Sequence, residues 1–175
     1  MNFKINKAIT SIGDEKKRYF RRIGIEIDRN PYMELAELLK ILKLNGIEVI
    51  EQNKKYIKIK QDRITYIIFQ APPYKENKYN WLDLRPILDL ELLCSFDDAG
   101  RERYVNQVMF WWVSLGSFGP ATGEYALQYF EIELQKVSDE EYILKQNGQK
   151  YTASVVETFY PFETIKCFAS IKPIN

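Results

Sequence analysis

The sequence predicts an α+β fold in which antiparallel sheets dominate. Three observations predict it: short runs in which apolar and polar residues alternate, turn residues between these runs, and separate stretches with helical spacing. The expected order is a β-α-βββ N-terminal part, two central helices, and a four-stranded antiparallel C-terminal part.

The N-terminal part contains one predicted helix among several predicted strands. Residues 3–9 and 23–28 have strand patterns, and Asn30-Pro31 followed by leucines at helical spacing predicts a helix that ends at Asn45-Gly46. Strand-like runs then cover residues 47–52, 56–60 and 64–70, and the short turns between them favour an antiparallel meander. In 56–60 the alternation predicts one apolar face and one wet, basic face.

The central part is predicted to be helical and the C-terminal part to be β. A leucine-rich run covers residues 84–96, helical from Pro86 on, and Asp97-Asp98 is expected to cap a helix over 101–115. Strands are expected over 125–137, 141–146, 149–156 and 164–172. Asn147-Gly148 separates two of them and is a typical dipeptide of a two-residue hairpin turn.

Positive and negative charges are unevenly distributed along the 175 residues. Residues 1–75 carry a net charge of +7 and residues 76–175 a net charge of −6, which together give the +1 of the whole chain. We expect a single domain, 1–175, in which a basic lobe (1–73) and an acidic lobe (81–175) could be joined by a loop (74–80). The asymmetry could serve an anionic partner, let the two halves attract each other, or have no function.

The chain contains no histidine, which removes whole classes of chemistry. Histidine is the usual general acid or base near neutral pH and the commonest metal ligand, so Ser-His-Asp and Cys-His pairs and HExxH zinc sites are excluded. We therefore expect no catalytic residue, no metal and no cofactor. Carboxylates alone can hold Mg²⁺, which keeps a metal-dependent hydrolase or nuclease as a second alternative. Its acidic groups would be Asp97-Asp98 with Glu102, Asp139-Glu140-Glu141, and Glu131 with Glu133.

Cysteine usage and hydropathy predict a cytoplasmic protein. Cys94 and Cys167 lie in apolar surroundings outside any CxxC pattern, which is typical of buried thiols, although a disulfide between them stays open. The N-terminus has no apolar signal-peptide region, and no stretch has the length of a membrane span.

One stretch resembles a known family. Residues 37–42, Asn45-Gly46 and residues 70–72 resemble the small α-β-β-β RNase toxins of the HicA family. That family places a catalytic histidine after a glycine near its second strand, where this chain has Asn53-Lys54-Lys55-Tyr56. The resemblance therefore implies a non-catalytic face of the kind that binds double-stranded RNA.

Two groups of residues are candidates for binding. Three successive rings on a helix span about 200°, so they are hard to bury on one face and one of them could reach a partner or a second packing surface. The candidate protein-binding residues are these rings and four acids: Phe110, Trp111, Trp112, Asp97, Asp98, Glu131 and Glu133. The candidate nucleic-acid-binding residues surround Tyr19 and Phe20 and are Lys16, Lys17, Arg18, Arg21 and Arg22.

These observations favour a non-catalytic protein that occludes a protein partner, as immunity proteins, antitoxins and inhibitors do. The partner would be another protein, such as a toxin or an enzyme, and an acidic face would suit the basic groove of a nuclease. A nucleic-acid-binding protein that uses the basic N-terminal region is the first alternative. We expect a bacterial or phage protein. The sequence does not determine the oligomeric state.

Overall fold

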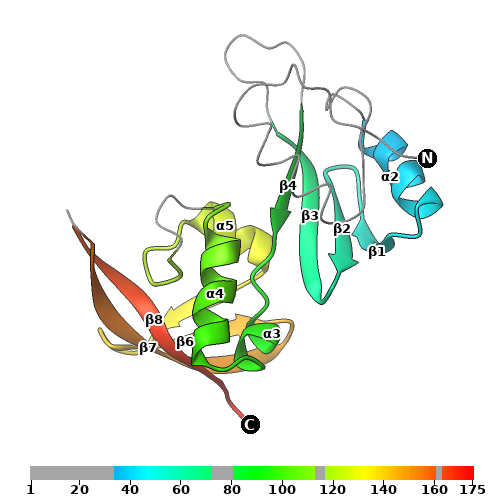
Figure 1. The fold of residues 1–175 in the computed structure, drawn as a ribbon. Helices are drawn as coiled ribbons and strands as arrows, with labels where there is room; N and C mark the ends of the chain where they lie inside the picture. The colour runs from blue at the N-terminus through cyan, green and yellow to red at the C-terminus, as the bar shows by residue number, and fades with distance from the viewer. Residues whose placement is uncertain (1–33, 72–80, 113–116, 161–162) are drawn as a thin grey trace. The chain divides into compact units, whose positions relative to one another are not determined.

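The computed structural model describes residues 34–71, 81–112, 117–160 and 163–175. The chain divides into two compact units, residues 1–86 and residues 87–175 (Figure 1). Each unit contains one four-stranded antiparallel sheet, which confirms the predicted α+β class. The predicted strands 3–9 and 23–28, the helix start at Asn30-Pro31 and the loop 74–80 lie outside the described residues. The prediction of two lobes within a single domain stays a prediction.

In the first unit, helix α2 (Leu35–Leu44) precedes the sheet β1-β2-β3-β4. The strands are β1 (Glu48–Gln52), β2 (Tyr56–Gln61), β3 (Ile64–Ala71) and β4 (Trp81–Pro86). Leucines and isoleucines of α2 pack with one face of the sheet, and the fully buried members of this core are Leu38, Leu42, Ile57, Ile59, Ile68 and Leu84. The helix ends as predicted, since Asn45 occupies the C-cap and Gly46 has a φ of +69°.

The helix predicted from Pro86 on within residues 84–96 is shorter in the structure, and a strand that the sequence did not predict precedes it. Residues 81–86 pair with β3, with Ile68 opposite Leu84 and Ile67 opposite Arg85. The helical part of this run is only α3 (Leu90–Cys94). The sheet therefore has four strands where the sequence predicted three, because the short alternation in residues 82–85 becomes a strand only by pairing with the edge of β3.

The second face of this sheet carries paired charges, which corrects the prediction of a wet, basic face. Lys58 is only 8% exposed, and its ammonium lies 2.8 Å from the carboxylate of Glu51 on the neighbouring strand. Tyr56 also donates a hydrogen bond to Glu51. Asp83 is 2% exposed and pairs at 3.0 Å with Arg85. Lys58 and Arg85 are thus neutralised within the sheet, whereas Lys60 on the same face is exposed.

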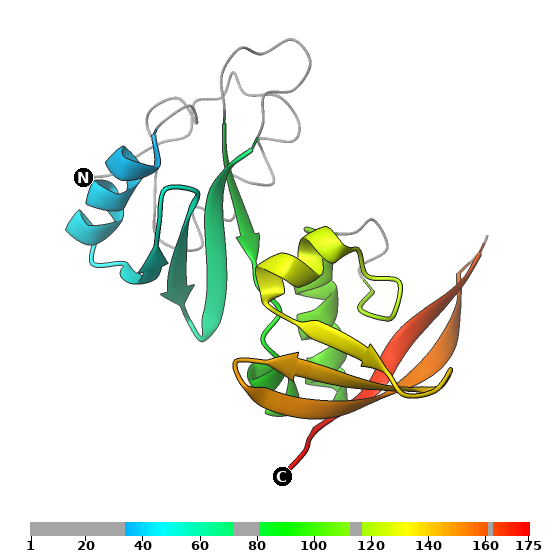
Figure 2. The ribbon, with the colours of Figure 1, turned by 180° about the vertical axis from the view of Figure 1, so that it is seen from behind.

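The second unit places three helices with the sheet β5-β6-β7-β8 (Figure 2). The helices are α3, α4 (Asp98–Met109) and α5 (Glu124–Phe130). The strands are β5 (Glu133–Lys136), β6 (Glu141–Gln146), β7 (Gln149–Tyr160) and β8 (Glu163–Pro173). Helices α3 and α4 lie on one face of the sheet, and the β7–β8 hairpin extends beyond them.

The helices differ from their predictions at three places. Helix α4 begins three residues earlier than expected, because the Asp97 side chain accepts a hydrogen bond from the Gly100 N–H at 2.7 Å, and it ends at Met109 rather than at residue 115. Residues 125–130, predicted as the start of a strand over 125–137, belong to α5. Glu131 ends α5 with a φ of +57°, and this left-handed residue turns the chain into β5.

The side chain of Gln146 connects three elements of the second unit. It is 5% exposed, and its oxygen accepts a hydrogen bond from the Leu90 N–H at 2.7 Å. Its nitrogen donates to the carbonyl oxygens of Leu88 at 2.8 Å and of Phe130 at 2.7 Å. One amide on β6 therefore fixes the start of α3 and the end of α5.

Two turns and two bulges shape the described strands. In β1, Val49 lies opposite Ile59 and Glu51 opposite Lys58, so Ile50 is an extra residue. Asn147-Gly148 forms the predicted hairpin turn, with φ values of +51° and +80°. Asp62 and Arg63 form the β2–β3 turn with φ values of +49° and +72°, a conformation that β-hairpins prefer. In the pairing of β7 with β8, Ser154 lies opposite Ser170 and Val155 lies opposite Phe168. Ala169 of β8 is therefore an extra residue, and it bends the hairpin.

The charge asymmetry follows the division into units. Residues 1–86 contain 18 basic and 11 acidic residues, a net charge of +7, and residues 87–175 contain 7 basic and 13 acidic residues, a net charge of −6. Among the described residues, no helix has the length and apolar character needed to cross a membrane.

Gln146→Met should strongly destabilise the second unit. Methionine fills a similar volume but leaves the Leu90 N–H and the carbonyls of Leu88 and Phe130 without this partner, and each buried unpaired group costs about 1–3 kcal/mol. We expect a loss of about 3 kcal/mol or more in the free energy of unfolding, measured by urea denaturation. Gln149→Met is the control, since Gln149 is exposed on the same hairpin. Equal stability of the two variants would contradict this role.

The ion pair of Glu51 should contribute to stability only above acidic pH. The Lys58 ammonium, and then the Tyr56 hydroxyl, hold the pKa of Glu51 below its ordinary value of 4.5. Because the pKa is lowered in the folded state, the stabilisation is present above pH 4.5 and is lost as the pH falls through the folded-state value.

Glu51→Gln should therefore lose less stability than the wild type between pH 6 and pH 3. The Glu51 side chain is 45% exposed, so we expect a difference of about 1 kcal/mol or less. Urea denaturation at each pH measures it, with Glu48→Gln on the same strand as a control that keeps the wild-type slope. Identical slopes for Glu51→Gln and the wild type would show that the pair does not stabilise the fold.

Candidate protein-binding surface

The structure describes all seven predicted protein-binding residues and none of the five predicted nucleic-acid-binding residues. Lys16, Lys17, Arg18, Arg21 and Arg22 lie outside the described residues. The seven others all belong to the second unit but do not form one cluster, because they lie at both ends of α4 and after α5.

Asp97 and Asp98 lie at the N-terminus of α4 and have a capping role. Asp97 is the N-cap residue, and Asp98 contacts Arg101 one turn later at 3.4 Å. Carboxylates at this end also interact favourably with the helix dipole. The twelve residues of α4 separate them from Phe110 by roughly 18 Å of helix axis. These two acids are therefore not part of the same local surface as the aromatic residues.

Glu131 and Glu133 lie on either side of the turn from α5 into β5. Glu131 is the exposed C-cap residue of α5, directly after the buried Phe130. Glu133 is exposed on β5, and its carboxylate lies 3.4 Å from the ammonium of Lys145 on β6. Glu131 thus lies next to the aromatic residues of α5, whereas Glu133 already takes part in a cross-strand ion pair.

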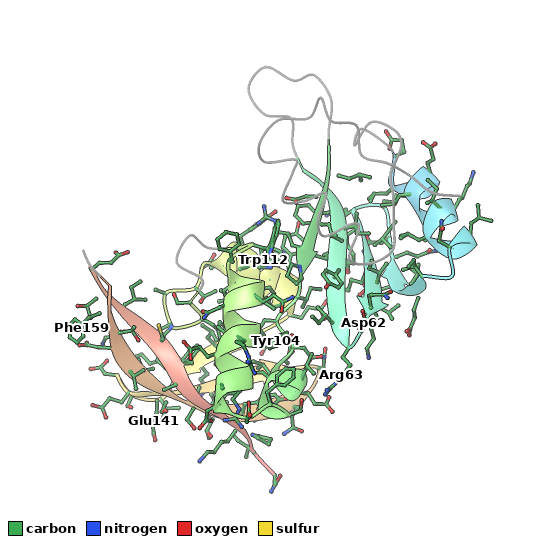
Figure 3. The ribbon with its side chains drawn as sticks, viewed as in Figure 1. Asp62, Arg63, Tyr104, Trp112, Glu141 and Phe159 are labelled. Carbon is green, nitrogen blue, oxygen red and sulfur yellow. The ribbon has the colours of Figure 1, made fainter. Side chains whose placement is uncertain are left out.

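The three successive rings follow the last residue of α4. Phe110 is the C-cap residue, keeps helical backbone angles (φ −52°, ψ −28°) and is 58% exposed, while Trp111 and Trp112 are half-buried in the turn after it. Trp112 lies at the end of α4, beside α5 (Figure 3).

Two tyrosines of α5 complete an aromatic surface that the sequence did not predict. The ring of Trp112 lies 5.9 Å from that of Tyr125, 5.4 Å from that of Tyr129 and 5.1 Å from that of Phe130, which is buried. Tyr125 and Tyr129 pack edge to face at 5.0 Å, and Tyr125 is 52% exposed. Phe110 and Trp111 pack edge to face with their ring centroids 6.2 Å apart, directly before Trp112 in the chain. We define the aromatic surface as Phe110, Trp111, Trp112, Tyr125 and Tyr129.

The spacing of Tyr125 and Tyr129 in the sequence is consistent with a helix that presents both rings on one side. Tyr125 and Tyr129 are four residues apart, which places them on one side of a helix. The sequence instead suggested a strand here, because Phe130, Ile132 and Leu134 alternate with polar residues. The helix forms because Gly123 and Glu131 begin and end it with suitable backbone angles.

Acidic side chains lie along the same helix. Glu124 is exposed and precedes Tyr125 directly, and the exposed Glu131 ends α5. With a net charge of −6 on residues 87–175, the aromatic surface lies in an acidic environment. Such a surface can bind an apolar or aromatic site with basic residues around it.

Five of the acidic residues considered as metal ligands cap a helix or form an ion pair, namely Asp97, Asp98, Glu131, Glu133 and Asp139. Within residues 34–71, 81–112, 117–160 and 163–175, no group of three or more Cys, Asp or Glu side chains could hold a metal ion. Asp139 pairs at 2.6 Å with Lys136, which lowers the pKa of Asp139 chiefly through this hydrogen bond. The described part of the chain therefore offers the metal-dependent alternative no site.

The chain matches no known protein family, no curated protein and no solved structure. The resemblance of residues 37–72 to the HicA RNase toxins thus receives no support from these comparisons. The function has to be inferred from the structure of the chain itself.

The segment before α5 is held tightly against β8. The Phe168 N–H, at the bulge, donates to the carbonyl of Phe118 at 2.9 Å. A Cβ atom at Gly119 would collide with the carbonyl oxygen of Lys166 and lie 3.0 Å from the Cα of Cys167. Residues 117–123 therefore form a packed loop that positions α5.

Gly119→Ala should destabilise the second unit and disturb the aromatic surface. The added methyl group meets backbone atoms that cannot move aside, and such overpacking costs about 1–3 kcal/mol. We expect a lower melting temperature and a changed tryptophan fluorescence spectrum. Gly123→Ala is the matched control, because a Cβ there meets nothing within 4 Å. If both variants melt like the wild type, the close approach does not exist.

Proposed function

We propose that this chain is a non-catalytic binding protein that occludes a site on a partner protein, and that the aromatic surface is its recognition site. The observation that supports the proposal is the exposure of Phe110 and Tyr125 beside three further rings of the same surface. Large aromatic residues are the usual energetic centre of protein interfaces.

The packing within the aromatic surface favours binding. Trp112 rests on the buried ring of Phe130, and Tyr125 and Tyr129 pack against Trp112 and against each other. Rings that are already held in place lose little side-chain entropy when a partner covers them. The exposed Phe110 then supplies apolar area that a partner pocket can bury.

Charge suggests what the partner surface is like. Residues 87–175 carry a net charge of −6, with Glu124 and Glu131 on the helix that holds Tyr125 and Tyr129. A partner with a basic contact site would associate faster and be favoured over acidic proteins. This supports an immunity, antitoxin or inhibitor type of function against a protein with a basic groove, for which a nuclease toxin is one example.

Two free thiols fit a reducing compartment. Cys94 and Cys167 are both unpaired and half-buried. Thiols persist in the cytoplasm and tend to pair outside it. The proposal therefore places the complex in the cytoplasm.

Affinity capture with matched variants tests the proposal. The tagged protein is used as bait in a lysate of its source cells, and bound proteins are quantified by mass spectrometry and size-exclusion chromatography. The test variant is Phe110→Ser/Tyr125→Ser, and the control is Val137→Ser/Phe159→Ser, which removes exposed apolar side chains elsewhere in the same unit.

A stoichiometric partner should bind the wild type and the control, and its affinity for the test variant should fall at least about 30-fold, as for two interface hot spots. Binding should also weaken with salt and with Glu124→Lys if the partner site is basic. Unchanged binding to the test variant, or no stoichiometric partner at all, would refute the proposal.

A further inference from the structure

The second unit also contains a groove between α4 and the β7–β8 hairpin. It has a volume of about 440 Å³, within the range of small-molecule sites. Its α4 side presents Arg101, Val105 and Asn106, and its hairpin side presents Val156 and Cys167. We call this site the α4–hairpin groove. The groove is separate from the aromatic surface, because its lining contains none of Phe110, Trp111, Trp112, Tyr125 and Tyr129.

The groove is lined by apolar side chains together with one partly covered cation, Arg101, and two carboxylates, Asp98 and Glu102. Val105 and Cys167 are half-buried and Val156 is 45% exposed, so these side chains do not close against one another. The extra residue Ala169 in β8 lies along the same side of the hairpin and bends it. The space between helix and hairpin is thus produced by the shape of the strands.

Arg101 is the polar residue whose hydrogen bonding is incomplete. Its Nε is buried and has no hydrogen-bond partner among the described residues. Its Nη1 lies 3.4 Å from Asp98, a long contact to a fully exposed carboxylate. A guanidinium offers five donors, so most of the hydrogen-bonding capacity of Arg101 is available to a ligand.

We infer that the α4–hairpin groove binds a small amphipathic monoanion, an organic acid with an apolar body. The carboxylate would bind the exposed nitrogens of Arg101, and the body would lie along Val105, Val156 and Cys167. A volume of about 440 Å³ holds on the order of ten to fifteen non-hydrogen atoms at the packing of liquid water. Asp98 and Glu102 also line the groove, and their negative charges disfavour a ligand with a second anionic group.

Protection of Cys167 from alkylation tests this site with defined probes. Cys167 lines the groove, whereas Cys94 does not and donates a hydrogen bond to the carbonyl of Ile171 at 3.4 Å. The wild-type protein is treated with iodoacetamide in the presence of decanoate, decanol or decylamine, all below their aggregation concentrations. Peptide mass spectrometry then gives the rate at each cysteine in the same sample, with Cys94 as the internal control.

Decanoate at ten times its dissociation constant should slow alkylation of Cys167 about tenfold and leave the rate at Cys94 unchanged. Decanol and decylamine share the apolar chain but lack the anion, so each should need at least about tenfold higher concentration. Equal protection by all three probes, or none by decanoate, would overturn the inference. This comparison uses only the wild-type chain, so it does not depend on the folding of a variant.

Two variants of α4 test whether Arg101 is the residue that binds the anionic group of the ligand. Arg101→Met should weaken decanoate protection between about 10- and 100-fold, and Arg103→Met, an equal change of charge at an exposed position of the same helix, should not. Equal effects of the two would assign the binding to net charge and contradict the role of Arg101. Partner binding by the aromatic surface is measured by affinity capture and ligand binding by the groove is measured by cysteine protection. A negative result in one experiment therefore does not contradict the other proposal.

Discussion

The amide of Gln146 is the interaction on which the second unit depends. A helix leaves its first N–H groups and its last carbonyls without partners inside the helix. Gln146 pairs with one group of each kind, the Leu90 N–H at the start of α3 and the Phe130 carbonyl at the end of α5. Helices of five and seven residues are too short to be stable alone, so they depend on such contacts with the sheet.

The aromatic surface is a consequence of this arrangement. Because Gln146 fixes the end of α5, the ring of Phe130 lies where Trp112 can pack on it edge to face, with an interplanar angle of 81°. Tyr125 and Tyr129 occupy the neighbouring positions of the same helix and extend the packing. The buried hydrogen bonds of Gln146 thus support the packing of the aromatic surface. Rings that are held in place before binding lose less side-chain entropy when a partner covers them.

The sequence predicted the parts of the fold that local residues determine. The turn at Asn147-Gly148, the helix end at Asn45-Gly46 and the cap at Asp97 are confirmed, since each depends on one or two backbone angles or one side-chain hydrogen bond. Strand β4 and helix α5 were missed. The alternation of Leu82 and Leu84 with Asp83 and Arg85 was present, but it becomes a strand only by pairing with β3.

The sequence predicted part of the aromatic surface, the rings after α4, but not the residues of α5 that complete it. Three adjacent rings indicated that one of them would be exposed, and Phe110 is. Their partners on α5 could not be predicted, because they come 13 to 18 residues later in a segment with a strand-like pattern. The α4–hairpin groove had no sequence signal, since it arises from an extra residue in β8 and from the position of a helix.

The central claim is that this protein acts by contact through the aromatic surface. The most direct measurement is photo-crosslinking in the source cells, with p-benzoylphenylalanine at position 110, at position 125, or at position 159 as a control that is more exposed than either. The account predicts one and the same crosslinked partner from positions 110 and 125 and none from position 159. Crosslinks from position 159 alone, or the same mixture of proteins from all three positions, would contradict it.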